Sequence, residues 1–278
     1  MIWQTSRRTF HLANRGVLMG IINVTPDSFS DGGSFDRVDD AVAHGLRLVE
    51  EGAEILDIGG ESTRPGAAPV DAGEELRRIL PVIEKLAAST TAALSIDTSK
   101  ASVARAAIQA GAEIINDVTA LQGDAEMTPV AAATGAAVVL MHLRGTPRTM
   151  QQDPHYDNVV DAVVTHLRER LAAARAAGLA ADRLAIDPGI GFGKTTEHNL
   201  QLIAGLGTFA ALGHPVLLGA SRKSFLATAA ASPEVTDRDT PTAALTAIGY
   251  QLGARIFRVH AVRPNLQTLR LAESLSAR

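Results

Sequence analysis

The chain has 278 residues, a hydrophobic fraction of 46% and a formal net charge of −4. This length suits one large α/β domain or two small ones and allows a substantial buried core. The slightly acidic balance and the lack of a basic run argue against binding to nucleic acid or to a membrane surface. There is no cysteine, so disulfides, thiol chemistry and thiolate metal sites are excluded.

The N-terminal segment carries no signal for export or membrane insertion. Met1 to Arg8 lack the apolar core of a signal peptide, and no apolar run approaches the roughly 18 residues that a membrane span needs. We therefore expect a cytoplasmic protein. Residues 1–15 are expected to form a short strand pair, or arm, that Trp3 and Phe10 anchor.

From residue 16 onward one unit repeats: an apolar strand, a turn rich in glycine or polar residues, and an amphipathic helix. The strands are continuous apolar runs, as expected when both faces of a parallel sheet are buried. The predicted strands are Val17–Asn23, Ile55–Gly59, Ala93–Asp97, Ile114–Val118, Ala137–His142, Leu184–Asp187, Val216–Gly219 and Ile256–Val259. Helices are predicted near 36–51, 73–88, 101–110, 125–134, 158–177, 198–206, 242–252 and 264–276.

Eight such units without a linker predict a single (β/α)8 TIM barrel over residues 16–278, preceded by the arm at 1–15. The alternative is a doubly wound open sheet. It would not close between its first and last strands, and its binding loops would gather at one switch point. Because polar loops follow nearly every predicted strand, we favour the barrel.

The stretch from Asp187 to Lys194, Asp-Pro-Gly-Ile-Gly-Phe-Gly-Lys, is the strongest local signal of a site. A short apolar run ends in a carboxylate, and three glycines then allow positive φ and a close approach of the backbone to a ligand. The alternative is an ordinary strand-to-helix turn in which Asp187 caps the next helix. Acids at the ends of other strands favour a binding role.

Active sites of such barrels lie at the C-terminal ends of the strands. In this chain those positions carry several carboxylates and amides, which favours a site for a polar heterocycle. Taken in chain order, the candidate residues at the strand ends are Asn23, Asp57, Asp97, Asn116, Asp117, Met141, His142, Asp187, Ser221, Lys223, Arg258 and His260.

Cations cluster after the seventh and eighth predicted strands, where such barrels commonly bind phosphate. Arg222 and Lys223 follow one strand, and Arg258 and His260 end the other. They favour an anion site. The alternative is that Arg222 and Arg258 pair with aspartates inside the barrel opening.

The loops at 23–33 and 59–67 are long and rich in glycine, proline and serine, which is typical of lids and binding loops. Phe29 is apolar in an otherwise polar loop, so we expect it to cover a bound ring. The alternative for Phe29 is a lone surface anchor.

Seven segments together make the chain resemble the dihydropteroate synthases. Any one of them is a weak signal, but they follow in order and with similar spacing from about residue 17 to the C-terminus. The segments are Asn23 to Gly33, Gly59 to Gly66, Asp97 to Lys100, Ile115 to Asp117, Asp187 to Gly193, Ser221 to Ser224 and Arg258 to His260.

The resemblance implies a (β/α)8 barrel, usually a homodimer, that uses Mg²⁺ to condense dihydropterin pyrophosphate with p-aminobenzoate on the folate pathway. It implies pterin binding by Asp97, Asn116, Asp187 and Lys223, pyrophosphate binding by Thr63, Arg258 and His260, metal binding by Asn23, and a p-aminobenzoate site at Arg64, Phe192 and Ser221. Met141, Gly219 and Phe29 complete the expected substrate-binding set, and the expected catalytic residues are Asp97, Lys223, Arg258 and His260. We also expect sulfonamides to compete with p-aminobenzoate.

The chemistry of these residues agrees with that role. A pterin edge offers amino and ring N–H donors, which buried carboxylates and an amide accept. Departure of pyrophosphate needs its growing charge to be stabilised, which Arg258, His260 and Mg²⁺ would do. We expect a dissociative reaction: C–O cleavage leaves a pterin-stabilised cation, near Asp97, that the neutral arylamine attacks.

One position departs from the family pattern. An acid usually follows the Arg-Val-His segment, and here residue 261 is alanine, which puts the detailed role of His260 in question. Two alternative functions stay open at this point. One is a related pterin-binding methyltransferase, which would share Asp97, Asn116 and Asp187, and the other is a homologue that binds pterin without turnover.

Overall fold

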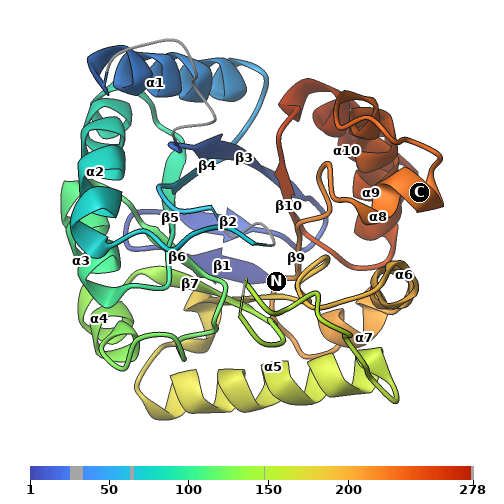
Figure 1. Ribbon diagram of the computed structural model, residues 1–278. Coiled ribbons are helices and arrows are strands. Elements are labelled where there is room, and N and C mark those ends of the chain that lie inside the picture. Colours follow the sequence, from blue (N-terminus) through green and yellow to red (C-terminus); the bar gives the residue numbers. More distant parts are fainter. Residues whose placement is uncertain (26–33, 63–65, 147, 277–278) are drawn as a thin grey trace.

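The computed structural model describes residues 1–25, 34–62, 66–146 and 148–276. Its central feature is a ring of parallel strands surrounded by helices (Figure 1). The barrel strands are β3 (Val17–Asn23), β4 (Ile55–Gly59), β5 (Ala93–Asp97), β6 (Ile114–Asp117), β7 (Ala137–Met141), β8 (Leu184–Asp187), β9 (Leu217–Leu218) and β10 (Ile256–Val259).

The sheet closes on itself, which confirms the barrel and rules out the open sheet. Its strand order is β8-β7-β6-β5-β4-β3-β10-β9, and each pair within this order is parallel. A parallel bridge between Ile186 of β8 and Val216, just before β9, joins the two ends. The Ile186 amide also donates to the Pro215 carbonyl at 2.9 Å.

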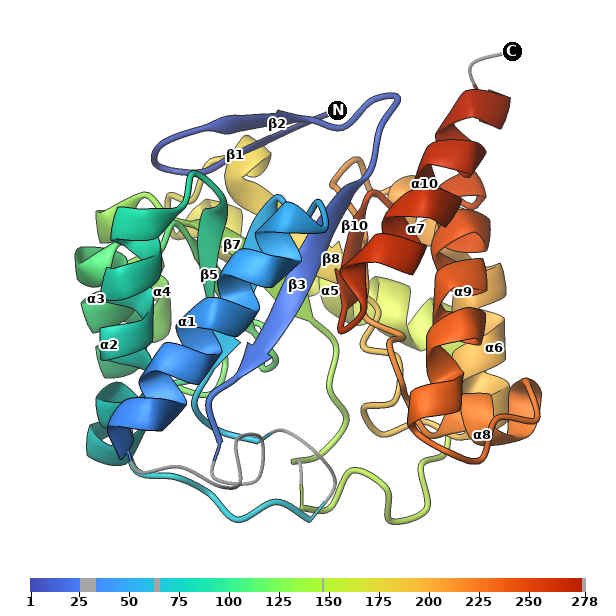
Figure 2. The ribbon, with the colours of Figure 1, turned by 90° about the horizontal axis from the view of Figure 1, so that it is seen from above.

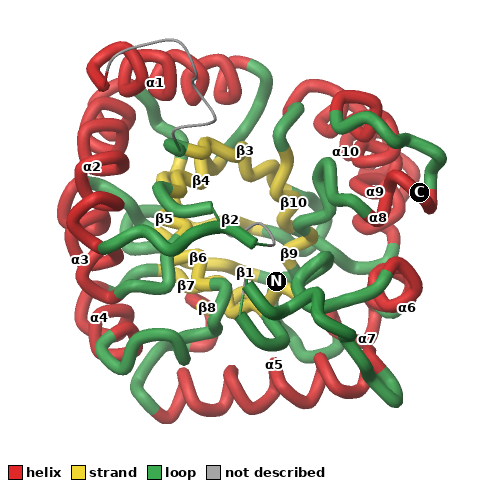
Figure 3. The backbone as a smooth tube through the Cα atoms, in the orientation of Figure 1, coloured by secondary structure: helices red, strands yellow, loops and turns green. Residues whose placement is uncertain are grey.

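The helices follow the predicted alternation, with two additions (Figure 3). They are α1 (Ser34–Glu50), α2 (Ala72–Ser89), α3 (Ala101–Ala110), α4 (Met127–Thr134), α5 (Val159–Ala176), α6 (Thr196–Ala204), α7 (Leu206–Ala210), α8 (Phe225–Ala229), α9 (Asp239–Gln251) and α10 (Val262–Ser276). Short 3₁₀ turns lie at Ala181–Arg183 and Thr236–Arg238.

Sequence reasoning misjudged the boundaries around the seventh strand. The predicted strand is Val216–Gly219, whereas β9 contains only two residues. Val216 makes a single bridge to Ile186 and does not continue the regular pairing of the strand. The helix predicted at 198–206 is split at Gly205 into α6 and α7. The five-residue α8 was not predicted, since one and a half turns are too short to show a helical period.

Helix α5 illustrates how a repeating unit forms. The side chain of Asn158 accepts hydrogen bonds from the amides of Val160 at 3.1 Å and Asp161 at 3.2 Å, which satisfies the otherwise unpaired first turn. Val163 and Leu167 then recur on one face of the helix and are fully buried against the sheet. This agrees with the four-residue spacing in the sequence.

Side chains alternate along each strand between the barrel interior and the helical layer, which gives two separate apolar cores. The outer core, between strands and helices, includes Leu18, Ile58 and Ile96. The inner core fills the N-terminal half of the barrel. It contains Trp3, Phe10, Leu12, Val17, Met19, Ile55, Ala93, Ile114, Ala137, Val139, Ala185, Leu217 and Ile256.

The N-terminal arm is an antiparallel hairpin of β1 (Ile2–Gln4) and β2 (Thr9–His11) that lies across one end of the barrel (Figure 2). Trp3 and Phe10 face each other in its register, with ring centroids 5.8 Å apart, and join the inner core. The Trp3 indole donates to the carbonyl of Arg183 at 3.1 Å. This confirms Trp3 and Phe10 as anchors and leaves the opposite end of the barrel, here called the mouth, for a ligand.

Among the residues that the structure describes, none of the helices has the length and apolar character needed to cross a membrane.

Candidate active site

The strand register brings most of the predicted site residues to the same level of the mouth. Asn23, Gly59, Asp97 and Asn116 are successive partners across β3, β4, β5 and β6. Met141 and Asp187 are partners on β7 and β8. All of these positions have the inward-facing parity of the inner core, so their side chains share the barrel interior.

Arg258 of β10 reaches across the barrel to acids of β4 and β5. Its Nε donates to Asp57 Oδ2 at 2.6 Å, and its Nη2 donates to Asp97 Oδ2 at 2.7 Å. Asn116 Nδ2 donates to the same Asp57 oxygen at 3.0 Å. The pairing of Arg258 with aspartates, considered above as an alternative to anion binding, is therefore present.

Asp57, predicted only to lie at a strand end, takes part in this network. It is fully buried, and its Oδ1 has no hydrogen-bond partner among the described residues. Asp57 lies two positions before Gly59 on β4, so its side chain points into the barrel as well. This alternation is the feature of the sequence that could have placed Asp57 in the site. Asp117 has the opposite parity, and its carboxylate accepts from the amides of Thr119 and Leu121 in its own loop.

In the mouth, the carboxylates of Asp57, Asp97 and Asp187 lie near the cations Arg258 and Lys223. Burial raises the pKa of Asp97 to about 7, which Arg258 opposes and the Asp57 carboxylate reinforces. Burial also raises the pKa of Asp187, with Lys223 opposing. Burial lowers the pKa of Lys223 to about 8, and Asp187 is the strongest opposing charge. The mutual effects show that these groups lie in one site.

The loop after β8 turns sharply through three glycines. Gly189, Gly191 and Gly193 have φ of +70°, +82° and +67°, and a Cβ at Gly189 would lie 1.9 Å from the His142 carbonyl oxygen. Asp187 Oδ1 accepts from the Gly189 amide at 2.7 Å. Asp187 thus stabilises its own turn and still faces the barrel interior, whereas the next helix, α6, is capped by Thr195 and not, as the alternative required, by Asp187.

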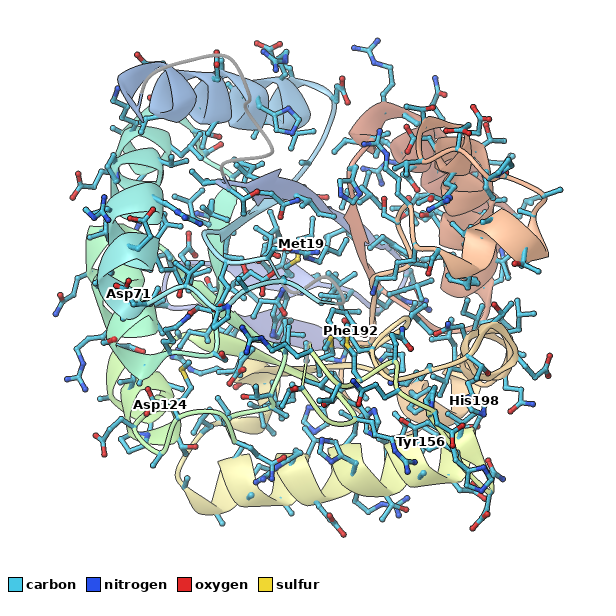
Figure 4. All side chains as sticks on the ribbon, viewed as in Figure 1. Met19, Asp71, Asp124, Tyr156, Phe192 and His198 are labelled. Carbon is cyan, nitrogen blue, oxygen red and sulfur yellow. The ribbon has the colours of Figure 1, made fainter. Side chains whose placement is uncertain are left out.

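Lys223 and Phe192 come together over this loop. The Lys223 ammonium lies 4.4 Å from the centre of the Phe192 ring and donates to the Ile190 carbonyl. In Figure 4, Phe192 projects near the barrel axis together with Met19 of the inner core, whereas Asp71 and Asp124 lie out on the helical ring.

Lys194 is a buried residue whose position sequence reasoning missed. Its Nζ lies 3.0 Å from His142 Nδ1, 3.4 Å from the His142 carbonyl and 2.8 Å from the Phe192 carbonyl. Burial lowers the pKa of Lys194 to about 7 and that of His142 to about 2. These contacts tie the glycine loop to the end of β7. Lysine is rarely buried, so no pattern in the sequence indicated this.

Ser221 and His260 are in contact at the ends of β9 and β10. Ser221 Oγ lies 2.9 Å from His260 Nδ1, and the His260 amide donates to the same oxygen at 3.1 Å. Arg222, by contrast, makes a bidentate ion pair with Asp239 of α9, with both contacts at 2.7 Å. Arg222 is therefore paired, as the alternative predicted, but with an acid of a helix and not with an aspartate inside the barrel opening.

The remaining predicted residues divide into two groups. Gly219 lies beside Asp187: a Cβ there would be 3.6 Å from Asp187 Oδ2. Phe29, Thr63 and Arg64 lie outside the described residues.

Comparison with known proteins identifies the class. A family model described as "Pterin binding enzyme" matches residues 19–260, which is most of the chain. The chain therefore belongs to the pterin-binding enzymes.

The similarity is to one branch of that family. The chain is 44% identical over 262 residues to "Dihydropteroate synthase" of Escherichia coli (strain K12), covering 94% of this chain and 92% of that protein. A structure of the Xanthomonas albilineans dihydropteroate synthase with 4-aminobenzoic acid has 47% identity and a TM-score of 0.94, covering 100% of this chain and 98% of that one. A sulfonamide complex of the Yersinia pestis enzyme has 41% identity and a TM-score of 0.93, with full coverage of both chains. The chain is accordingly a transferase of the folate pathway, of the dihydropteroate synthase type.

The clash at Gly189 generates a first prediction. Gly189→Ala is expected to lower the free energy of unfolding by about 1–3 kcal/mol more than Gly178→Ala, because overpacking adds to backbone strain. Gly178 is a matched control, since its φ is +95° and nothing lies within 4 Å of a Cβ there. Urea unfolding of both variants measures the difference, and equal losses would contradict the close approach.

The raised pKa of Asp97 generates a second prediction. Between about pH 4 and about pH 7 the folded chain retains a proton that the unfolded chain releases, so the free energy of unfolding falls as pH rises through this window. Asp97→Asn should flatten this fall, because the amide does not titrate. Urea midpoints across the window measure both slopes. An unchanged slope in the variant would show that Asp97 is ionised throughout.

Proposed function

We propose that the chain condenses 6-hydroxymethyl-7,8-dihydropterin pyrophosphate with p-aminobenzoate, giving 7,8-dihydropteroate and pyrophosphate. The observation that carries the proposal is the shared position of acids and cations in one mouth: Asp97, Asn116 and Asp187 face Lys223 and Arg258. The similarity to dihydropteroate synthases over nearly the whole chain supports the same reaction.

The acids of the mouth are matched to the donor edge of a pterin. Asn116 uses its Nδ2 on Asp57, so its carbonyl oxygen is the end left for a ligand. The Asn116 carbonyl oxygen and the carboxylates of Asp97 and Asp187 are three hydrogen-bond acceptors for the ring N–H and amino groups of a pterin. Lys223 supplies the complementary donor for a ring oxygen or nitrogen.

Arg258 and His260 are proposed to stabilise the departing pyrophosphate, together with Thr63. Arg258 already shares its Nε and Nη2 with Asp57 and Asp97, so it enters the reaction in a fixed orientation. We propose a dissociative step in which the C–O bond to pyrophosphate breaks first. The resulting cation is delocalised over the pterin, and the negative charge of Asp97 favours it.

The p-aminobenzoate site is proposed to lie at Phe192 and Ser221, with Arg64 and Phe29 from the two long loops and Met141 and Gly219 lining the mouth. The neutral amine attacks the pterin cation and then loses a proton. Because a sulfonamide complex of the Yersinia pestis relative is known, we propose that sulfonamides compete with p-aminobenzoate here.

Mg²⁺ is proposed to bind at Asn23, as one protein ligand beside the substrate phosphates. The described residues contain no group of three or more His, Cys, Asp or Glu side chains able to hold a metal, so they build no full cage. A hard amide oxygen at an inward-facing strand end fits an ion that keeps several waters. When bound, the ion would neutralise charge on the leaving pyrophosphate.

A homodimer is also proposed. Ile248 of α9 and Leu271 and Leu275 of α10 are exposed by 49%, 63% and 62%, on two helices that a Gln251 to Ala272 hydrogen bond of 3.1 Å joins. If a second copy covers them, Leu271→Glu should convert the dimer to a monomer in sedimentation velocity. A wild-type monomer at micromolar concentration would contradict the proposal.

A cytoplasmic location of the protein stays a prediction.

The decisive test is turnover of the purified chain with both substrates and Mg²⁺, measured as pyrophosphate release and as dihydropteroate. We expect activity that chelation of Mg²⁺ removes. Asp187→Ala should lower kcat/KM for the pterin substrate by about 100-fold or more, since a charge-assisted bond and a buried carboxylate are lost together. Asp182→Ala, an acid outside the mouth, is the control.

Two outcomes would contradict the proposal. Pterin binding without pyrophosphate release would favour the non-catalytic homologue, whereas methyl transfer to or from a pterin would favour the methyltransferase. Normal kcat/KM in Asp187→Ala would remove the proposed pterin contact.

A further inference from the structure

Arg222 adopts a backbone conformation that residues with a side chain rarely take. Its φ is +56°, in the left-handed region where a Cβ crowds the following carbonyl oxygen. The Lys223 amide donates to the Ala220 carbonyl at 3.3 Å, so Arg222 is the third residue of a tight turn. Where a turn requires positive φ at this position, glycine is the usual residue. An arginine there is strained unless other contacts hold it.

One segment at the start of α9 supplies such contacts to the side chain and to the backbone of Arg222. The guanidinium makes its bidentate ion pair with Asp239, the first residue of α9. The Arg222 amide donates to Thr242 Oγ1 at 3.2 Å, and the Arg222 carbonyl accepts from Arg238 Nη1 at 3.2 Å. Thr242 Oγ1 in turn donates to the Arg238 carbonyl at 2.6 Å. Together these contacts offset the strain at residue 222.

The turn decides where the next side chain points. Arg222 reaches toward α9, whereas the Lys223 side chain lies against the glycine loop after β8. The Lys223 ammonium donates to the Ile190 carbonyl and lies 4.4 Å from the centre of the Phe192 ring. A Cβ at Gly191 would be 2.9 Å from Lys223 Cδ, so the side chain follows the loop backbone closely. Because the two residues share a peptide bond, a change of φ at Arg222 would move Lys223 off this surface.

The Arg222–Asp239 pair differs from an ordinary surface ion pair. The two side chains are 31% and 27% exposed, and water weakens a lone pair with such access. This pair is bidentate, however, and it acts on the same residue as two backbone hydrogen bonds. Its main effect is therefore on the conformation of residue 222.

We propose that Arg222 is a positioning residue for Lys223: its ion pair with Asp239 keeps residue 222 in the left-handed conformation, which directs the Lys223 ammonium into the mouth. The consequence for pterin binding rests on the proposed function, whereas the geometry does not. Arg222, expected from the sequence to contact an anion, thus serves the pterin side of the site through its neighbour.

The first experiment uses the protein without substrates, so its outcome does not depend on turnover. Carbon-13 labelling of lysine gives few side-chain NMR signals, because the lysines of the chain are Lys85, Lys100, Lys194 and Lys223. The Phe192 ring should shift the Lys223 Cε protons upfield of those of exposed Lys85. Asp239→Ala should remove most of that shift, and an unchanged Lys223 signal in this variant would overturn the proposal.

The second experiment compares two replacements of Arg222 by calorimetry with 6-hydroxymethylpterin, a probe that has no pyrophosphate to lose. Both replacements remove the ion pair, but glycine adopts positive φ without strain and alanine does not. Arg222→Ala should weaken the Kd about fivefold, because only molecules with Lys223 in place bind at full strength. Arg222→Gly should weaken the Kd less. An Arg222→Gly variant that binds no better than Arg222→Ala would overturn the proposal.

A double-mutant cycle tests whether Asp239 acts through Lys223. Asp239→Ala should weaken binding of the probe in the wild-type background and have no further effect in a Lys223→Ala background. Equal factors in the two backgrounds would overturn the proposal. Asp39→Ala is the matched control, since it removes an ion pair of 2.6 Å to Lys85 between α1 and α2, and it should leave the Kd unchanged.

Two further outcomes are separated in advance. Thermal unfolding of each variant identifies a simple loss of fold, and should Arg222→Ala not fold, the Asp239→Ala cycle still decides the question. Failure of the wild type to bind the probe would contradict the proposed function, while the lysine signals would still decide the role of Arg222.

Discussion

The arginine of β10, held between two aspartates inside a closed barrel, is the interaction on which the site depends. A guanidinium with only 21% of its side chain exposed is stable there because Asp57 and Asp97 accept its Nε and Nη2. The same Asp57 oxygen fixes the Asn116 amide. One ion-pair network therefore orients side chains from four strands, β4, β5, β6 and β10, before any ligand arrives, which lowers the cost of binding.

A second set of contacts fixes the glycine loop relative to that network. Lys194 joins the loop to His142, and the Tyr156 hydroxyl donates to the Gly193 carbonyl at 3.0 Å. In Figure 4, Tyr156 and His198 lie together at the edge of the barrel, with ring centroids 5.1 Å apart. Because His142 and Tyr156 hold the backbone of the loop, Asp187 and Phe192 have little freedom to move.

Much of the fold was predictable, and the failures have clear causes. Continuous apolar runs located every barrel strand, since a strand buried on both faces has to be apolar. β9 was overextended because its length depends on pairing, which residue type does not encode. Among the site residues, Asp97, Asn116 and Asp187 were found from their strand ends. Asp57 was found there as well, but its pairing with Arg258 was not predicted, and Lys194 was not found because contacts distant in sequence bury it.

The sequence by itself determined the alternation of strands and helices, the inward parity of the polar residues and the family. These are local properties: residue type, spacing and motif order. Only the tertiary structure decided which charges meet: Arg258 with Asp57 and Asp97, Arg222 with Asp239, Ser221 with His260. The physical reason is that each pair joins residues of different segments, and only the folded arrangement of these segments sets which side chains come within hydrogen-bond distance.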